Sequence, residues 1–126
     1  MILGTSRSVR VWAASTPTDL RKGYNGLFAL VKSSLARDPL SGELFLFLNR
    51  TRTSCKVLLW DGTGLCIFSK RLERGRFAKL WREDAAAVQL TASELSLFIE
   101  GCELVGRRAL SPREILPIPL ADDRGP

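Results

Sequence analysis

The side chains of this chain with the most chemistry to offer are arginines and lysines that gather in the middle of the sequence. Residues 50–82 hold nine basic and two acidic side chains, whereas residues 83–126 hold four basic and eight acidic ones. The whole chain of 126 residues carries 19 Lys and Arg against 13 Asp and Glu, a net charge of +6. A concentrated basic stretch attracts phosphate backbones or an acidic protein surface. The alternative is a solvated face without a partner.

Catalytic chemistry has weaker support in the sequence. The chain contains no histidine, which excludes His-dependent triads, His-ligated metals and a His proton shuttle. The carboxylates that a metal-assisted nuclease could use do not pair at a spacing typical of a metal site. Those carboxylates are Asp19, Asp38, Asp61, Glu73, Glu83 and Asp84. Because no reactive groups converge, the sequence predicts a protein that is not an enzyme and that uses no cofactor or metal.

The cysteines and the apolar runs indicate a cellular compartment. Cys55, Cys66 and Cys102 are odd in number and form no C-x-x-C pair, which disfavours a zinc site, a thioredoxin-like motif and a disulfide framework. We expect three reduced, mostly buried thiols. The longest apolar runs, 27–31 and 44–48, are five residues each, too short to span a membrane. These features predict a cytoplasmic protein without a membrane partner.

A strand and a long helix are predicted for the N-terminal part of the chain. Residues 8–13 alternate as a strand does, and the segment 16–19, Thr-Pro-Thr-Asp, has the chemistry of a helix start. Apolar side chains at helical spacing then predict one long amphipathic helix over residues 18–36. Gly23 and Gly26 weaken it by about 1 kcal/mol each and indicate a close approach on that face. The apolar stripe consists of Leu20, Tyr24, Leu27, Phe28, Val31 and Leu35.

Three strand-like runs in the middle of the chain predict an antiparallel meander. The runs are residues 44–49, 55–60 and 65–70. The link 50–54 is polar, and the segment 61–64, Asp-Gly-Thr-Gly, has the composition of a hairpin turn. Both faces of these strands are apolar, so both must be covered. Two helices are few for that purpose, so the sheet could curl on itself or meet a partner chain, which leaves a homo-oligomer open.

The remaining sequence completes a single-domain prediction. Residues 91–94, Thr-Ala-Ser-Glu, have the spacing of a capping box and open a short helix that Gly101 stops. Residues 88–90 are a candidate for a further strand. We predict one α+β domain over residues 1–105, an antiparallel β meander packed against one long N-terminal helix and one short C-terminal helix. The proline-dotted residues 106–126 are predicted to be an extended or disordered tail.

This topology brings distant basic residues together. In a meander, the first turn and the end of the third strand lie at the same end of the sheet. Asp61 and Glu43 fall at the opposite end. Arginine presents a fork of donors that fits phosphate or carboxylate. The seven residues predicted to converge, called here the basic end, are Arg50, Arg52, Lys56, Lys70, Arg71, Arg74 and Arg76, with Arg21 and Lys22 as weaker additions.

Several motifs together resemble a known family of small proteins. They include Asp19-Leu20-Arg21-Lys22-Gly23, Asp38-Pro39-Leu40-Ser41-Gly42, Trp60-Asp61-Gly62-x-Gly64 and the run Lys70-Arg71-Leu72-Glu73-Arg74-Gly75-Arg76-Phe77. Over about residues 7–101 the chain resembles the second-open-reading-frame accessory protein (TnpB type) of the insertion-sequence-sixty-six family of bacterial transposable elements. This family is unrelated to the RNA-guided nuclease that shares the TnpB label. Members often carry Trp-Pro shortly after Gly-Arg-Phe, and this chain lacks that proline.

The resemblance implies an accessory role in DNA transposition, beside a separate transposase that carries the acidic catalytic residues. Two mechanisms stay open. In the first, the basic end holds phosphates of the element's DNA and stabilises a transposase–DNA complex, with little sequence specificity because no base-reading element is visible. In the second, the protein is an adaptor without direct DNA contact. Its basic end then meets an acidic patch on the transposase or on another accessory protein of the same element.

Overall fold

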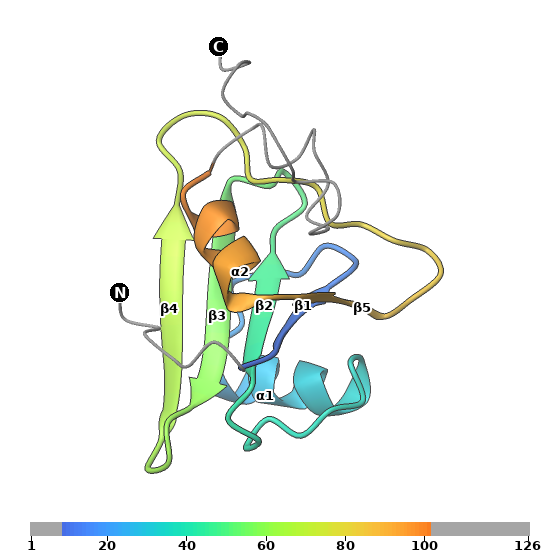
Figure 1. Cartoon of the computed structure of the whole chain (residues 1–126), viewed down its shortest axis with the longest axis vertical. Helices are drawn as coiled ribbons and strands as arrows, with labels where there is room; N and C mark the ends of the chain where they lie inside the picture. The colour runs from blue at the N-terminus through green and yellow to red at the C-terminus, as the bar shows by residue number, and fades with distance from the viewer. Residues whose placement is uncertain (1–8, 102–126) are drawn as a thin grey trace.

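A five-stranded sheet with a helix on each face organises the protein (Figure 1). We describe residues 9–101 of a computed structural model. The strands lie side by side in the order β4-β3-β2-β1-β5. In chain order the elements are β1 (Val11–Ala14), α1 (Tyr24–Ser33), β2 (Leu44–Leu48), β3 (Ser54–Trp60), β4 (Leu65–Arg71), β5 (Ala87–Leu90) and α2 (Ala92–Ile99).

The three central runs of the sequence form the expected hairpins. β2 pairs antiparallel with β3, with Phe45 opposite Leu58, and β3 pairs antiparallel with β4, with Leu58 opposite Ile67. The turn between β3 and β4 is closed by Asp61, whose carboxylate accepts hydrogen bonds from the backbone amides of Thr63 and Gly64, both at 2.9 Å. Gly62 has a φ of 105°, a conformation that glycine adopts without strain.

The predicted fold class was wrong in its account of the sheet. β1 lies inside the sheet and pairs parallel with β2, with Val11 opposite Leu44, while β5 pairs antiparallel with β1. The meander is therefore three strands of a mixed sheet. Parallel neighbours need a crossover between them, and α1 provides it. β1 and β5 are only four residues long, and no short hairpin turn joins either of them to the strand with which it pairs.

The predicted long N-terminal helix is also absent. α1 spans ten residues, because the segment before it forms a loop. The Asp19 carboxylate accepts hydrogen bonds from the amide and the guanidinium of Arg21. The Thr18 amide donates to the carbonyl of Leu48 at 2.9 Å. Gly23 is the N-cap rather than an interior residue. At the other end the helix is followed by Ala36 with a φ of 55°, which ends the helical path.

The short C-terminal helix α2 agrees with the prediction. The Thr91 hydroxyl accepts from the amide of Glu94 at 3.0 Å, and the Glu94 carboxylate accepts from the amide of Thr91 at 2.8 Å. This reciprocal capping box satisfies two of the amides at the helix start. Gly101 follows the helix with a φ of 74°, which favours glycine.

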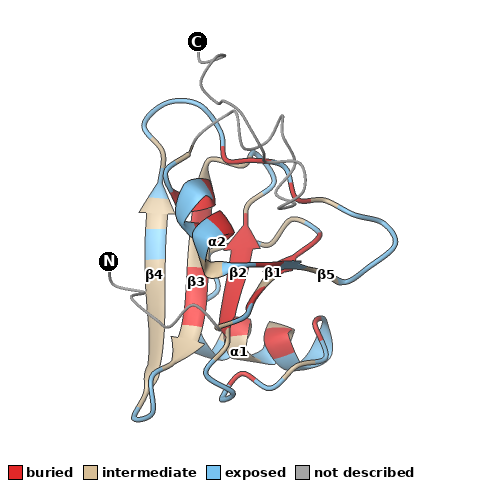
Figure 2. Ribbon diagram, viewed as in Figure 1, coloured by how far each residue is buried: buried red, intermediate tan, exposed pale blue. Residues whose placement is uncertain are grey.

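Each apolar face of the sheet is covered by elements of the same chain (Figure 2). α1 packs Leu27 and Val31 against one face. The other face is covered by α2 and by Phe77, Ala78 and Leu80 from the loop between β4 and β5. The sequence analysis counted only the two helices as cover for the sheet and did not include this loop. Because the loop covers part of the second face, the apolar faces are not evidence for a partner chain. A homo-oligomer stays a prediction.

Two further expectations concern membrane spans and the C-terminal tail. No helix in residues 9–101 is long and apolar enough to cross a membrane. The prediction of an extended tail at 106–126 lies outside the described residues.

Candidate nucleic-acid interface

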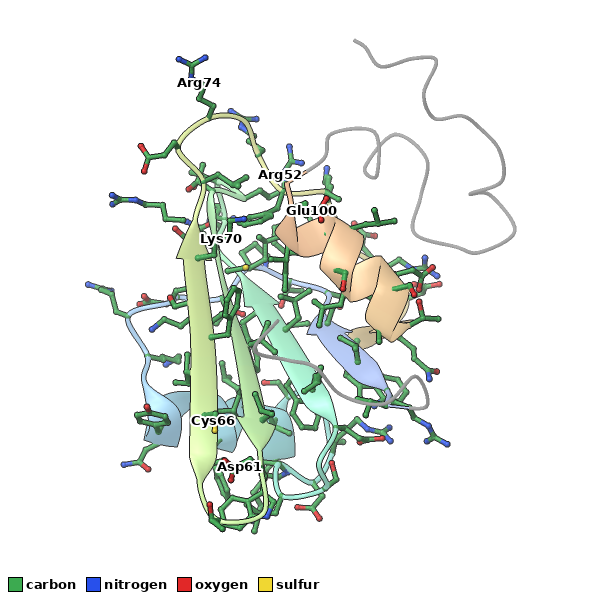
Figure 3. All side chains as sticks on the ribbon, turned by 60° about the vertical axis from the view of Figure 1, so that its left-hand side comes forward. Arg52, Asp61, Cys66, Lys70, Arg74 and Glu100 are labelled. Atoms are coloured by element: carbon green, nitrogen blue, oxygen red, sulfur yellow. The ribbon has the colours of Figure 1, made fainter. Side chains whose placement is uncertain are left out.

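The basic end is formed by two segments that are far apart in sequence and hydrogen-bonded to each other. The Leu72 amide donates to the carbonyl of Thr53 at 2.8 Å, so the loop after β4 lies against the link between β2 and β3. Figure 3 shows Arg52, Lys70 and Arg74 toward one end of the sheet and Asp61 and Cys66 toward the other. The pairing of Ser54 with Arg71 places Arg71 beside the same link. Glu73 is the one acidic residue in the run from Lys70 to Arg76.

The link between β2 and β3 is shaped by Asn49. Its side-chain oxygen accepts from the amides of Thr53 and Ser54, at 2.9 and 3.1 Å, and its side-chain amide donates to the Thr53 hydroxyl. These bonds tighten the link into a turn that presents Arg50 and Thr51 to solvent. Arg52 adopts a left-handed conformation with a φ of 61°, uncommon for a residue with a side chain.

Three of the seven residues at the basic end make hydrogen bonds within the fold. Arg52 donates to the carbonyl of Phe77 at 3.0 Å, and Lys70 donates to the carbonyl of Ile99 at 2.9 Å. Lys56 donates to the carbonyl of Lys22 at 3.0 Å. Arg52 and Lys70 are half-buried and hold the loop and α2 in place, so we regard them as structural. Lys56 is half-buried too, but this one bond leaves other donors of its ammonium for a ligand.

The other four residues of the basic end are exposed arginines. None of them takes part in an ion pair with another residue of the described range 9–101. They come from the β2–β3 link, the end of β4 and the loop that follows. Guanidinium groups that converge without carboxylate partners repel one another and are suited to an anionic ligand. The four are Arg50, Arg71, Arg74 and Arg76.

Arg21 and Lys22 lie beside the basic end. The Arg21 guanidinium contacts the Asp19 carboxylate at 2.7 Å, which holds the pKa of Asp19 well below its usual range and raises the pKa of Arg21. Arg21 and Arg50 line the same surface groove of about 580 Å³. Lys22 is exposed, and its carbonyl is the acceptor for Lys56. Both weaker additions therefore adjoin the predicted site.

Most of the carboxylates considered for catalysis take part in turns or ion pairs of the fold. Asp61 closes its turn, and the hydrogen bonds from Thr63 and Gly64 lower its pKa. Asp19, Glu83 and Asp84 line one groove of about 780 Å³ between the loop before α1 and the loop before β5. Within residues 9–101, however, no three side chains of metal-binding type are close enough together to hold an ion.

The thiols inside the described range are not arranged for chemistry. Cys55 and Cys66 are both free. Burial raises the pKa of Cys55 to about 12. Burial and the neighbouring Asp61 carboxylate also raise the pKa of Cys66. A thiol with a raised pKa is a poor nucleophile, because the thiolate is the reactive form. Cys102 lies outside the described residues.

One residue beside the site was misplaced by the sequence analysis. Tyr24 belongs to the predicted apolar stripe, yet its exposed fraction is 53%, the largest of any large hydrophobic side chain in the described range. It is the first residue of α1, where the stripe has not yet reached the sheet. The nearby glycines and the polar phenol are the only sequence signals for this exposure.

The fold and this surface define a small domain with an exposed basic end, and the comparisons with known proteins give its family. The family described as "IS66 Orf2 like protein" matches residues 9–109, so the chain belongs to that family. Two relatives from Sinorhizobium fredii, the uncharacterized proteins y4hO and y4jC, are 38% and 36% identical. Each alignment covers 81% of this chain, and 88% and 86% of the respective relative. No solved structure matches.

Family membership confirms the resemblance drawn from the motifs. The protein is an accessory protein of transposition for an insertion sequence and is associated with that transposition machinery. The match begins at residue 9, close to the start of the resemblance, and extends eight residues beyond Gly101.

Proposed function

We propose that this accessory protein binds the phosphates of its element's DNA through the basic end and performs no catalysis of its own. The observation that carries the proposal is the group of four exposed arginines, Arg50 from the β2–β3 link and Arg71, Arg74 and Arg76 from the run that ends β4 and continues into the next loop. They find no carboxylate partner in residues 9–101, whereas the four ion pairs of that range involve other basic residues.

Charge and shape support phosphate contacts rather than base reading. Contacts to phosphate fix the position of a protein on DNA but carry no sequence information. The basic end consists of loops and of the adjoining ends of β3 and β4, and none of its seven residues belongs to a helix of the range 9–101. Binding is therefore weakly sequence-specific, and its affinity falls steeply with salt because each phosphate contact releases counterions.

The proposal is tested by comparing two variants that lose the same kind of charge at different places. The first is the double variant Arg74→Gln/Arg76→Gln. The matched control is Arg10→Gln/Lys32→Gln. The Arg10 carbonyl accepts from the amide of Leu44 at the start of β2, and the Arg10 guanidinium lies 3.9 Å from the carboxylate of Glu43, at the opposite end of the sheet. Lys32 lies in the last turn of α1, so both are remote from the basic end.

Binding to a labelled duplex is measured by fluorescence anisotropy between about 50 and 200 mM salt. We expect the first variant to bind at least about tenfold more weakly and to flatten the slope of log K against log salt by about 0.9 for each lost phosphate contact. The control keeps the wild-type slope. Equal behaviour of the two variants, or no DNA binding by the wild type, would overturn the proposal.

The same arginines also fit an acidic protein surface, which is the adaptor mechanism. A pull-down of the transposase and of the other accessory protein, with and without nuclease, separates the two. Under the proposal, nuclease treatment releases the partners, because DNA bridges them. Capture that survives nuclease and is lost in Arg74→Gln/Arg76→Gln would support the adaptor instead.

A further inference from the structure

A second polar surface adjoins the basic end on the sheet face that α1 covers. Side chains of β3 and β4 alternate between the two faces, and Leu58 and Ile67 pack toward α1. Lys56 is paired with Ser69, and Ser54 is paired with Arg71, so these four side chains belong to the same face. Ser69 and Arg71 are exposed, and Ser54 and Lys56 are half-buried.

This part of the face stays open because α1 begins late. Residues before Tyr24 form a loop, so the helix covers the part of β3 and β4 around Leu58 and Ile67. Toward the basic end only the loop reaches this face, through the Lys22 carbonyl that accepts from Lys56, and Ser69 and Arg71 stay exposed. Two serines lie between the cations, and their small hydroxyl side chains leave room and supply hydrogen-bond donors. The result is a polar and positively charged surface on which small serine side chains lie between the cations.

The surface continues into the groove beside the β2–β3 link. That groove of about 580 Å³ is lined by Arg21 and Arg50, and Ser54 belongs to both the groove and the open face. The groove is also lined by Asp19, the ion-pair partner of Arg21. A path of polar and mostly cationic side chains therefore runs from the loop before α1, across the link, to the end of β4. We call it the polar track, and it consists of Arg21, Arg50, Ser54, Lys56, Ser69 and Arg71.

An exposed aromatic side chain lies close in sequence to the loop that contacts the polar track. Tyr24 has an exposed fraction of 53% and lies two residues after Lys22, whose carbonyl accepts a hydrogen bond from Lys56 at 3.0 Å. Phe45, Phe47, Phe77 and Phe98, by contrast, are fully buried. A cationic path beside an exposed aromatic ring is the arrangement that binds single strands, whose phosphates contact the cations while a base stacks on the ring.

We propose that the polar track binds single-stranded DNA, with a base stacked on Tyr24. This inference rests on the proposed function and names its substrate class. In a duplex the bases are already paired and stacked on one another, so none is free to stack on the ring of Tyr24. Only the phosphate contacts then contribute to binding. The protein is then suited to DNA whose strands have separated.

The test compares oligonucleotides of equal length by fluorescence anisotropy at low salt, using the full chain. The probes are a single-stranded DNA, the same sequence as a duplex and the same sequence as single-stranded RNA. The variants are Tyr24→Leu, which removes the ring, and Tyr24→Trp, which keeps a stacking surface. Lys32→Gln, on the same helix but remote from the track, is the control, and circular dichroism verifies folding of each variant.

We expect tighter binding of single-stranded DNA than of duplex, and a loss of roughly 5- to 100-fold for the single strand in Tyr24→Leu. Duplex binding stays unchanged in that variant, and Tyr24→Trp binds the single strand as the wild type does. Equal affinity for single strand and duplex, or no effect of Tyr24→Leu, would overturn this inference and leave the proposed function standing. Preference for RNA would also overturn it. Failure to bind any DNA would overturn the proposed function itself.

Discussion

The guanidinium of Arg52 donates a hydrogen bond to the backbone carbonyl of Phe77 at 3.0 Å, and the amide of Phe77 donates back to the carbonyl of Arg52 at 2.7 Å. This reciprocal pair joins the β2–β3 link to the loop after β4. The ring of Phe77 is buried and stacks on Phe98 of α2, with 4.9 Å between ring centroids. Arg52 therefore connects the basic end to the core beneath α2.

Arg52 should affect stability more than DNA binding. Arg52→Ala loses the bond to Phe77 but keeps the left-handed backbone at φ 61°, so we expect the free energy of unfolding to fall by about 1–2 kcal/mol. Arg52→Gly loses the same bond but relieves a backbone cost of about 1–2 kcal/mol, so its stability should lie closer to wild type. Urea denaturation measures both.

Arg50→Ala is the matched control, because Arg50 is exposed in the same link and has no ion-pair partner in residues 9–101. Its stability should match the wild type within about 0.5 kcal/mol. If Arg52→Ala is as stable as the wild type, Arg52 has no structural role and is again a candidate for DNA contact, like the exposed arginines.

Lys70 is expected to hold the end of α2. Its ammonium donates to the carbonyl of Ile99 at 2.9 Å, and α2 has no basic residue of its own in the last turn. A cation at a helix C-terminus is favourable, so Lys70→Met should lower the free energy of unfolding by about 1 kcal/mol. Hydrogen exchange should accelerate in α2 first. Lys79→Met, at an exposed lysine of the loop, should leave α2 unchanged.

The end of the sheet that carries the positive charge could be predicted from the sequence, but the role of each charge could not. The meander followed from the three strand-like runs in 44–70 and from the Asp-Gly turn, and it fixed which turns share an end. Whether a lysine reaches a backbone carbonyl depends on where α2 and the loop after β4 pack. That packing joins residues 29 positions apart, as in Lys70 and Ile99, and local patterns do not specify it.

The failed prediction of a long helix has a local cause. Thr18 and Asp19 carry side chains that cap helices and also close turns, because both roles use the same hydrogen bonds to backbone amides. In this chain the Thr18 amide donates to the Leu48 carbonyl, and the Asp19 carboxylate accepts from the Arg21 guanidinium. These two hydrogen bonds stabilise a turn in place of a helix start. Sequence alone did not reveal that Leu48 lies next to Thr18, since this contact exists only once β1 and β2 are parallel neighbours.

Gly26 should resist replacement although it lies inside a helix. Alanine normally stabilises a helix interior by about 1 kcal/mol relative to glycine. A Cβ at Gly26, however, would lie 2.9 Å from the Cβ of Lys22 and 3.1 Å from its Cγ. We therefore expect Gly26→Ala to give no gain in the free energy of unfolding, and to displace Lys22 from beside Lys56.

A double-mutant cycle isolates this contact. In a Lys22→Gly background the crowding atoms are gone, so Gly26→Ala should then stabilise by about 1 kcal/mol. Thermal or urea denaturation of the four proteins gives the coupling. If Gly26→Ala gains the same stability in both backgrounds, Lys22 does not pack on Gly26 as described.

Asp61 should make the β3–β4 hairpin sensitive to acid. Hydrogen bonds from the amides of Thr63 and Gly64 lower the pKa of this carboxyl below its ordinary 3.8. A group whose pKa is lower in the folded state stabilises the fold fully above its unfolded pKa, and this contribution is lost as the pH falls through the folded value. Asp61→Ala should therefore lower the urea midpoint at about pH 7, and its difference from the wild type should shrink toward about pH 3.

Asp61→Asn separates the charge of this residue from its hydrogen bonds. The amide oxygen of asparagine accepts the same backbone hydrogen bonds but does not titrate, so the variant should keep the turn and lose the part of the acid dependence that Asp61 contributes. Asp38→Asn serves as a matched control, since the Asp38 carboxylate also accepts a backbone amide, from Leu40, in a different turn. A constant difference between the wild type and Asp61→Ala across the acid range would show that ionisation of Asp61 does not stabilise the hairpin.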